Sequence, residues 1–137
     1  MTQLERLYQV ADDEDIPIVR RALHGTPSIT LKRGRKRMIA LDRARRETNA
    51  EETTFVAHEL GHCFTDTFYY TYTPAIEVRR RESRAWRWAI QDLLPYDKFD
   101  PCLRKYDGNL WETSEELGIS FELLRRACQL YYDVTIS

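Results

Sequence analysis

The sequence is organised around residues 48–67, which read TNAEETTFVAHELGHCFTDT. Thr48 and Asn49 are both suitable helix N-caps, and Glu51 or Glu52 stands three positions after each, the spacing of a capping box. Apolar residues follow at Phe55, Val56, Leu60 and Cys63. This pattern predicts a helix that begins near residue 49 and ends between Thr65 and Thr67.

Two of the three histidines of the chain lie inside this helix, in His58-Glu59-Leu60-Gly61-His62. Four residues advance a helix by ~6 Å and overshoot one turn by about 40°, so both imidazoles leave the same face. A catalytic zinc site typically uses three protein ligands and one open position. Glu59 leaves the helix about 100° away from His58, which places it beside the metal as a general base for water.

The third ligand is predicted in the next helix. A third histidine in the pattern of the metzincins is excluded, because positions 65 and 68 are Thr65 and Phe68. His24 lies in a loop flanked by Pro and Gly, where a lone histidine is more often solvated. Glu82 shares one helical stripe with small residues that allow close packing on the first helix, namely Ala85 and Ala89. The alternative for Glu82 is an ion pair within the basic run 79–84.

Several neighbouring residues have open or structural interpretations. Gly61 in mid-helix costs ~1 kcal/mol relative to Ala, which indicates a close approach to another element. Cys63 is expected to be a buried small residue, and Asp66 either supports an imidazole or ends the helix. The three tryptophans are expected to anchor packing between helices, at Trp86, Trp88 and Trp111.

The rest of the chain predicts an α+β fold with a helical second half. A helix is expected at residues 2–13, an edge strand at 16–19, and a β-hairpin from 28–31 and 37–41, so that the small sheet is antiparallel in part. Further helices are expected at 77–94, 97–105, 109–117 and 120–132, the last with Ser120 as N-cap. We expect one domain over 1–137, with a core at 1–95 and a helix-turn-helix-like extension at 96–137.

Composition excludes several classes of protein. Hydrophobic residues make up 42% and charged residues 31% of the 137 residues, which is typical of a globular domain. The net charge of −1, from 21 basic and 22 acidic residues, excludes a uniformly basic nucleic-acid binder. No run approaches the ~20 apolar residues of a membrane helix, and three cysteines do not make a closed disulfide set. We therefore expect a soluble cytoplasmic protein with no membrane partner.

Charge is nevertheless unevenly distributed along the chain. Residues 20–46 hold ten Lys or Arg and one acid, Asp42, which is either a surface that steers an acidic partner or a solvated face. Residues 107–137 hold six acids and two arginines, so the helix pair there is poorly suited to phosphates. Direct nucleic-acid binding is thus disfavoured, with the 20–46 region as the remaining candidate.

The sequence resembles the ImmA/IrrE-type metallopeptidases, which are common on prophages and integrative elements. The resemblance spans most of the chain and includes Ile39-Ala40-Leu41-Asp42, the HELGHC motif at 58–63, Phe68-Tyr69, and Tyr72 with Pro74. It continues with Glu82-x-x-Ala85-x-x-Trp88-Ala89, which matches the third-ligand helix of the family, and with Leu93-Leu94-Pro95. Trp86 departs from a position that is often acidic in the family, and the hairpin turn is unusually basic.

The resemblance implies a zinc-dependent endopeptidase that cleaves a repressor or another regulatory protein of a phage or mobile element. In the implied mechanism Glu59 takes a proton from the attacking water and delivers it to the leaving amine. Tyr69 or Tyr72 then hydrogen-bonds the developing oxyanion, although aromatic packing is the more common role of such residues. The alternatives are a regulator that binds metal and a partner or DNA without cleaving, and a component of a toxin–antitoxin pair.

Overall fold

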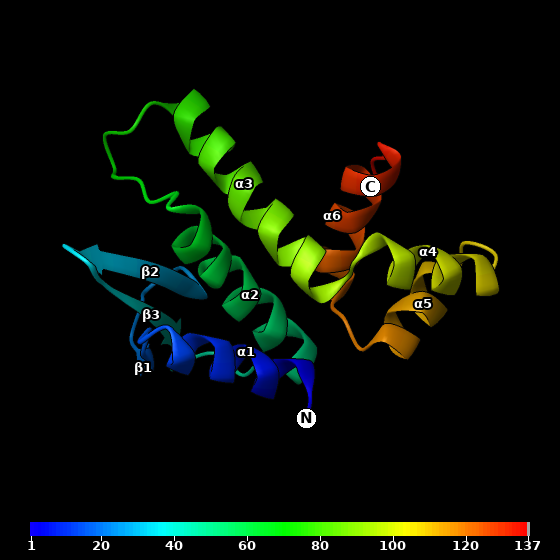
Figure 1. Ribbon diagram of the computed structural model, residues 1–137, viewed down its shortest axis with the longest axis horizontal. Coiled ribbons are helices and arrows are strands. Elements are labelled where there is room, and N and C mark those ends of the chain that lie inside the picture. The colour runs from blue at the N-terminus through cyan, green and yellow to red at the C-terminus, as the bar shows by residue number, and fades with distance from the viewer. Residues whose placement is uncertain (137) are drawn as a thin grey trace.

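The computed structural model describes residues 1–136 and confirms the α+β class. Within these residues the elements are α1 (Gln3–Asp13), β1 (Ile18–Arg21), β2 (Ser28–Arg33), β3 (Lys36–Asp42), α2 (Asn49–Thr65), α3 (Ala75–Leu93), α4 (Tyr96–Lys105), α5 (Leu110–Leu117) and α6 (Phe121–Tyr132). Figure 1 shows the sheet on one side of α2 and α3, and α4, α5 and α6 at the other end of the molecule. The predicted helices lie within two residues of those observed.

The sheet has the strand order β1-β3-β2 and is mixed. β2 pairs with β3 in antiparallel register, from Ser28 opposite Leu41 to Arg33 opposite Lys36, which confirms the predicted hairpin. β1 pairs with β3 in parallel and begins at Ile18, two residues later than predicted. The difference arises because the amide of Ile16 donates a hydrogen bond to the carbonyl oxygen of Ala11 at the end of α1, at 2.8 Å, rather than to a strand. The order leaves β2 as an edge strand whose outer side is unpaired among the described residues.

The helix α2 begins and ends as its sequence predicts. The hydroxyl of Thr48 accepts a hydrogen bond from the Glu51 amide, and the Glu51 carboxylate accepts one from the Thr48 amide. This capping box uses Thr48 rather than Asn49, which is the first helical residue. The helix ends at Thr65, because Asp66 adopts the left-handed conformation with φ 52° and ψ 50°.

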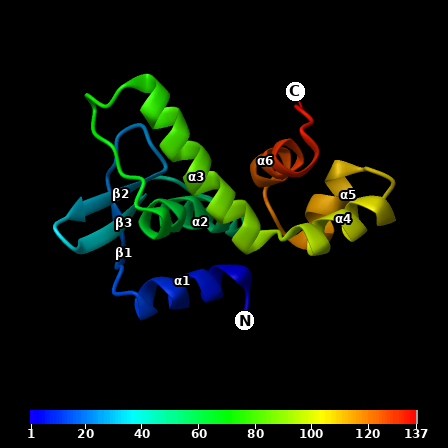
Figure 2. The ribbon, with the colours of Figure 1, turned by 45° about the horizontal axis from the view of Figure 1, so that its top comes forward.

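Helices α2 and α3 lie side by side in both ribbon views (Figures 1 and 2). Gly61 makes this approach possible: a Cβ at this position would lie 2.3 Å from the carbonyl oxygen of Ala85. Ala85 and Ala89 face α2 and are fully buried. The expected close contact at Gly61 is therefore confirmed, and its partner is the backbone of α3.

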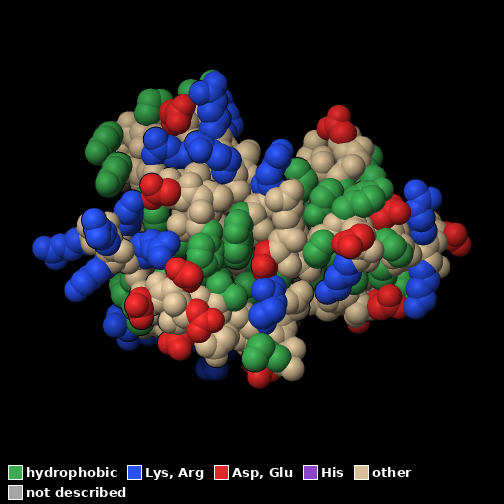
Figure 3. All heavy atoms as spheres, in the orientation of Figure 1, with side chains coloured by type: hydrophobic (Ala, Val, Ile, Leu, Met, Phe, Trp, Pro, Cys, Tyr) green, Lys and Arg blue, Asp and Glu red, His purple; other side chains and the backbone are tan. Residues whose placement is uncertain are grey.

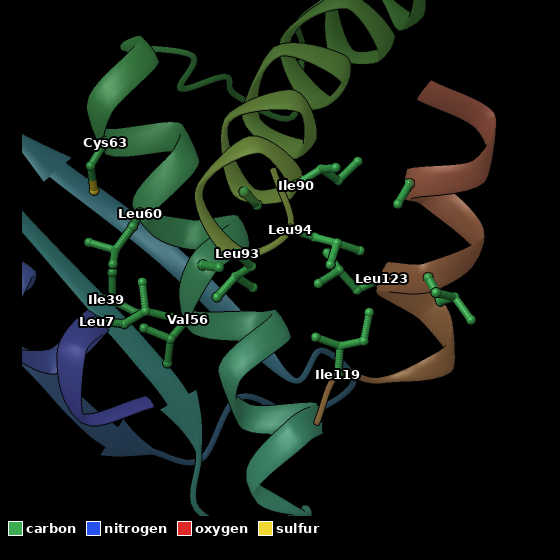
Figure 4. Packing of buried hydrophobic residues seen from close by; sticks show 14 of the residues in the cluster. Leu7, Ile39, Val56, Leu60, Cys63, Ile90, Leu93, Leu94, Ile119 and Leu123 are labelled. Carbon is green, nitrogen blue, oxygen red and sulfur yellow. The ribbon is translucent and has the colours of Figure 1, made fainter. Parts of the chain in front are cut away.

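One cluster of buried apolar residues extends through the molecule. It includes Leu7 of α1, Ile39 of β3, Val56 of α2, Leu93 of α3 and Leu123 of α6 (Figure 4). In this view Leu94, directly after α3, lies next to Leu123 of α6. The cluster therefore joins residues 1–95 and the helical extension. No helix within residues 1–136 combines the length and the apolar character that crossing a membrane requires.

The predictions for Trp86, Trp88 and Cys63 are confirmed by the structure, whereas that for Trp111 is not. Trp88 stacks on Phe64 with ring centroids 5.0 Å apart, and Trp86 packs against α2 and α6, as expected. Trp111 is 67% exposed, so the expectation that it anchors helix packing is wrong. Cys63 is 4% exposed and unpaired, in agreement with the expected buried residue.

Candidate metal centre

Three side chains from two helices converge, His58 and His62 from α2 and Glu82 from α3. Nε2 of His58 lies 2.7 Å from Oε2 of Glu82, and Nε2 of His62 lies 3.0 Å from Oε1 of the same carboxylate. One ligand atom from each residue lies within 4.8 Å of the others. The structure thus brings together the three ligands predicted from the sequence.

The hydrogen bonds of His62 determine which nitrogen is available for a metal. Nδ1 of His62 lies 3.0 Å from the carbonyl oxygen of Thr67, which only accepts hydrogen bonds, so Nδ1 carries the proton. In the neutral imidazole, Nε2 then presents a lone pair toward a carboxylate oxygen of Glu82. Two electron-pair donors face each other, and a cation between them fits this arrangement.

Thr67 reaches His62 because of the helix end. The left-handed Asp66 turns the chain back, and the Thr67 amide donates to the His62 carbonyl oxygen at 3.1 Å. Asp66 itself forms an ion pair with Lys32 at 2.7 Å, so the helix-end interpretation of this residue is confirmed. Sequence reasoning missed Thr67, although a polar residue directly after the predicted helix end is a usable signal.

His58 is held between two carboxylates. Its Nδ1 lies 3.3 Å from Oε2 of Glu59, and its ring stacks on Trp86 at 4.1 Å with an interplanar angle of 13°. Burial disfavours the charged imidazolium, but hydrogen bonds to Glu59 and Glu82 outweigh it and raise the pKa of His58 to about 9. Burial likewise opposes ionisation of Glu82, yet the adjacent His58 and His62 and the Tyr69 hydroxyl outweigh it and lower the pKa of Glu82. The site therefore favours positive charge beside its carboxylates.

Glu59 is 4% exposed and is held by the edge strand β2. Its Oε2 accepts a hydrogen bond from the Ser28 hydroxyl at 2.7 Å, and its Oε1 accepts one from the Thr30 hydroxyl at 2.6 Å. Burial raises the pKa of Glu59, but His58 and the two hydroxyls outweigh this effect and lower it. Glu59 is therefore a buried carboxylate. Two hydroxyls at alternate positions of a strand share one face, a signal that sequence reasoning did not use.

A cavity of about 300 Å³ opens onto this centre. Tyr69 lines it and donates a hydrogen bond from its hydroxyl to Oε1 of Glu82 at 2.7 Å. Tyr72 is 80% exposed and stacks on Tyr70, so the structure does not bring it to the centre. His24 is exposed in the loop between β1 and β2 and is not part of the ligand cluster.

Comparison with protein families identifies the chain. The model of the IrrE N-terminal-like domain, Peptidase_M78, matches residues 11–129. A search of curated proteins returned no match. The matched region contains the whole ligand cluster and the β2 strand that holds Glu59. The chain therefore belongs to the IrrE N-terminal-like family of metallopeptidases, with His58, His62 and Glu82 as its ligand group.

Proposed function

We propose that the chain is a zinc-dependent endopeptidase that cleaves a regulatory protein, such as a repressor of a phage or mobile element. The observation that carries the proposal is the buried Glu59 carboxylate beside the ligand cluster, because a purely structural metal site does not need it. Two imidazole nitrogens and one carboxylate oxygen are a typical catalytic zinc set. When bound, zinc supplies Lewis-acid polarisation of the scissile carbonyl group.

Glu59 acts as the general base and acid in this proposal. It takes the proton from the attacking water and delivers it to the leaving amine as the C–N bond breaks. Ser28 and Thr30 each engage one of its oxygens, which limits rotation of the carboxylate and keeps it in one orientation. Preorganisation of this kind lowers the cost of reaching the reactive geometry.

Tyr69 is the better of the two tyrosines for contact with the substrate. Its hydroxyl already lies in the cavity, bonded to Glu82, and a small movement brings it to a substrate carbonyl oxygen as a hydrogen-bond donor. Burial and the bond to Glu82 raise the pKa of Tyr69 to about 12, so the hydroxyl stays protonated at neutral pH. Tyr72 has no such contact.

The unpaired edge of β2 suits an extended peptide. Ile29 lies between the two residues that hold Glu59 and lines the same cavity. A substrate segment that adds to this edge forms main-chain hydrogen bonds and passes the ligand cluster. This mode of binding favours a polypeptide substrate with an exposed, extended segment.

The test compares the wild-type protein with Glu59→Gln on a purified candidate repressor, chosen from the genes that neighbour the one for this chain. We expect both proteins to bind one zinc ion, and the variant to lose cleavage by roughly 10²–10⁴-fold. Glu77→Gln is a matched control, because Glu77 lies on α3 in contact with Arg80 and Arg81 rather than with the ligand cluster. Undiminished cleavage by Glu59→Gln refutes the proposed role of Glu59, and chelator-insensitive cleavage removes the metal from the reaction. Stoichiometric zinc without cleavage by the wild type favours a non-cleaving regulator.

A further inference from the structure

A groove of about 800 Å³ lies between α3 and α6, next to the metal centre. Four arginines line it: Arg79, Arg84 and Arg87 from α3, and Arg126 from α6. Glu82 and Trp86 also line the groove. Figure 2 shows α6 standing beside α3, and Figure 3 shows Lys and Arg side chains gathered over α3. The groove and the 300 Å³ cavity share Glu82.

Arg126 pairs with Glu122 at 2.9 Å, but the positive charge of the three arginines of α3 is not neutralised by a carboxylate of the described residues. Within residues 1–136, no carboxylate lies within ion-pairing distance of Arg79, Arg84 or Arg87. By contrast, Arg80 and Arg81 of the same helix both pair with Glu77. The carboxylate that lines the groove, Glu82, is already bonded to the two histidines and Tyr69. The three arginines of α3 are therefore available to an acidic ligand.

Trp86 connects the groove to the ligand cluster. Its ring stacks on His58 at 4.1 Å, and the guanidinium of Arg126 lies 3.9 Å from its ring centroid. Two groups this close to one ring lie on opposite faces of it, so Trp86 separates Arg126 from His58 by one ring. A ligand side chain bound in the groove beside Arg126 therefore lies only a few residues of extended peptide from the scissile bond.

We propose that this groove is a substrate subsite for Asp or Glu side chains that flank the scissile bond. This inference rests on the proposed peptidase function. Arginine forms charge-assisted, often bidentate hydrogen bonds with carboxylates. Val78, Ile90 and Leu130 also line the groove and offer apolar contacts to a peptide. The acidic segment 107–137, which contains α6, disfavours a long polyanion such as a nucleic acid.

The first test measures binding without cleavage, in the Glu59→Gln protein. The probes are two short fluorescent peptides, one of alternating Glu and Ala and one of alternating Gln and Ala. We expect the acidic peptide to bind more tightly, and Arg84→Glu/Arg87→Glu to weaken it by roughly tenfold or more. The control Arg43→Glu/Arg46→Glu makes the same charge change at exposed positions between β3 and α2, and is expected to bind as before. Equal zinc content reports that each variant is folded.

The second test measures where the wild-type protein cleaves a peptide library, with mass spectrometry as the readout. We expect acidic residues to be enriched on one side of the cleaved bonds, and Arg84→Glu/Arg87→Glu to abolish that enrichment. Cleavage without acidic preference, or peptide binding that the groove variant does not change, overturns the subsite and leaves the peptidase function intact. If the wild-type protein cleaves no peptide but still binds the acidic peptide through the groove, the peptidase function is refuted instead. A single-stranded oligonucleotide that displaces the acidic peptide more effectively than unlabelled peptide overturns the assignment to a peptide.

Discussion

Gly61→Ala tests whether the contact between α2 and α3 sets the metal centre. The added Cβ would lie 2.3 Å from the carbonyl oxygen of Ala85 and 3.0 Å from its carbonyl carbon. Reaching a separation of 3.0 Å from the oxygen requires the helices to part by at least about 0.7 Å, the difference between 3.0 and 2.3 Å. Glu82 lies on α3, less than one turn before Ala85, so it moves with that helix away from His58 and His62 on α2.

The free energy of unfolding and the zinc affinity respond differently to this change. Replacing a helical Gly by Ala stabilises a helix by ~1 kcal/mol, whereas overpacking a close contact costs about 1–3 kcal/mol. We therefore expect the metal-free protein to be destabilised by up to ~2 kcal/mol. Ligand distances must lie within about 0.2 Å of their preferred values, so we expect zinc affinity to fall by roughly 10–100-fold.

Urea unfolding in the presence of chelator measures the first quantity, and competition with a chromophoric chelator measures the second. The double variant Gly61→Ala/Ala85→Gly is the control, because the contact is with the Ala85 backbone and removing its side chain leaves that contact in place. We expect this variant not to recover zinc affinity. A Gly61→Ala protein that is about 1 kcal/mol more stable and binds zinc as tightly as the wild type refutes the reasoning.

Three further predictions concern other parts of the molecule. Thr30→Val removes one of the hydrogen bonds that orient Glu59, so we expect kcat to fall by about tenfold or more with little change in KM. A rise in KM as large as the fall in kcat would contradict this. Burial and the hydrogen bond to Glu52 raise the pKa of Tyr8 to about 12, so its contribution to stability is complete below pH 10 and is lost between pH 10 and 12. Tyr8→Phe is expected to reduce the alkaline loss of stability, as measured by urea unfolding across that range. Phe99→Ala leaves a cavity at a fully buried position of α4, so we expect it to lower the free energy of unfolding by about 3–5 kcal/mol in a single unfolding transition. Separate transitions for residues 1–95 and 96–137 would contradict the prediction of one domain.

The helices, the hairpin and the ligand set were predictable because their signals are local. The His58 and His62 spacing places two imidazoles on one face of any helix, whatever surrounds it. The capping box at Thr48 and the N-cap at Ser120 act within one turn, and both occur as predicted. Glu82 could be predicted as a ligand because the alanines on its stripe indicate that α3 packs closely on another helix. Gly61 of α2, which has no side chain, lies at that contact.

The surroundings of the ligands depend on contacts between segments far apart in the chain. Ser28 lies 31 residues from Glu59, and only the packing of β2 on α2 shows that its hydroxyl holds the carboxylate. Aromatic composition does not distinguish Trp86, stacked on His58, from Trp111, which is 67% exposed. The basic groove likewise needs α6 to lie beside α3, because Arg126 and Arg87 are distant in sequence. Helix periodicity and capping thus specify which residues bind the metal, whereas long-range packing specifies how they are oriented and what lies beside them.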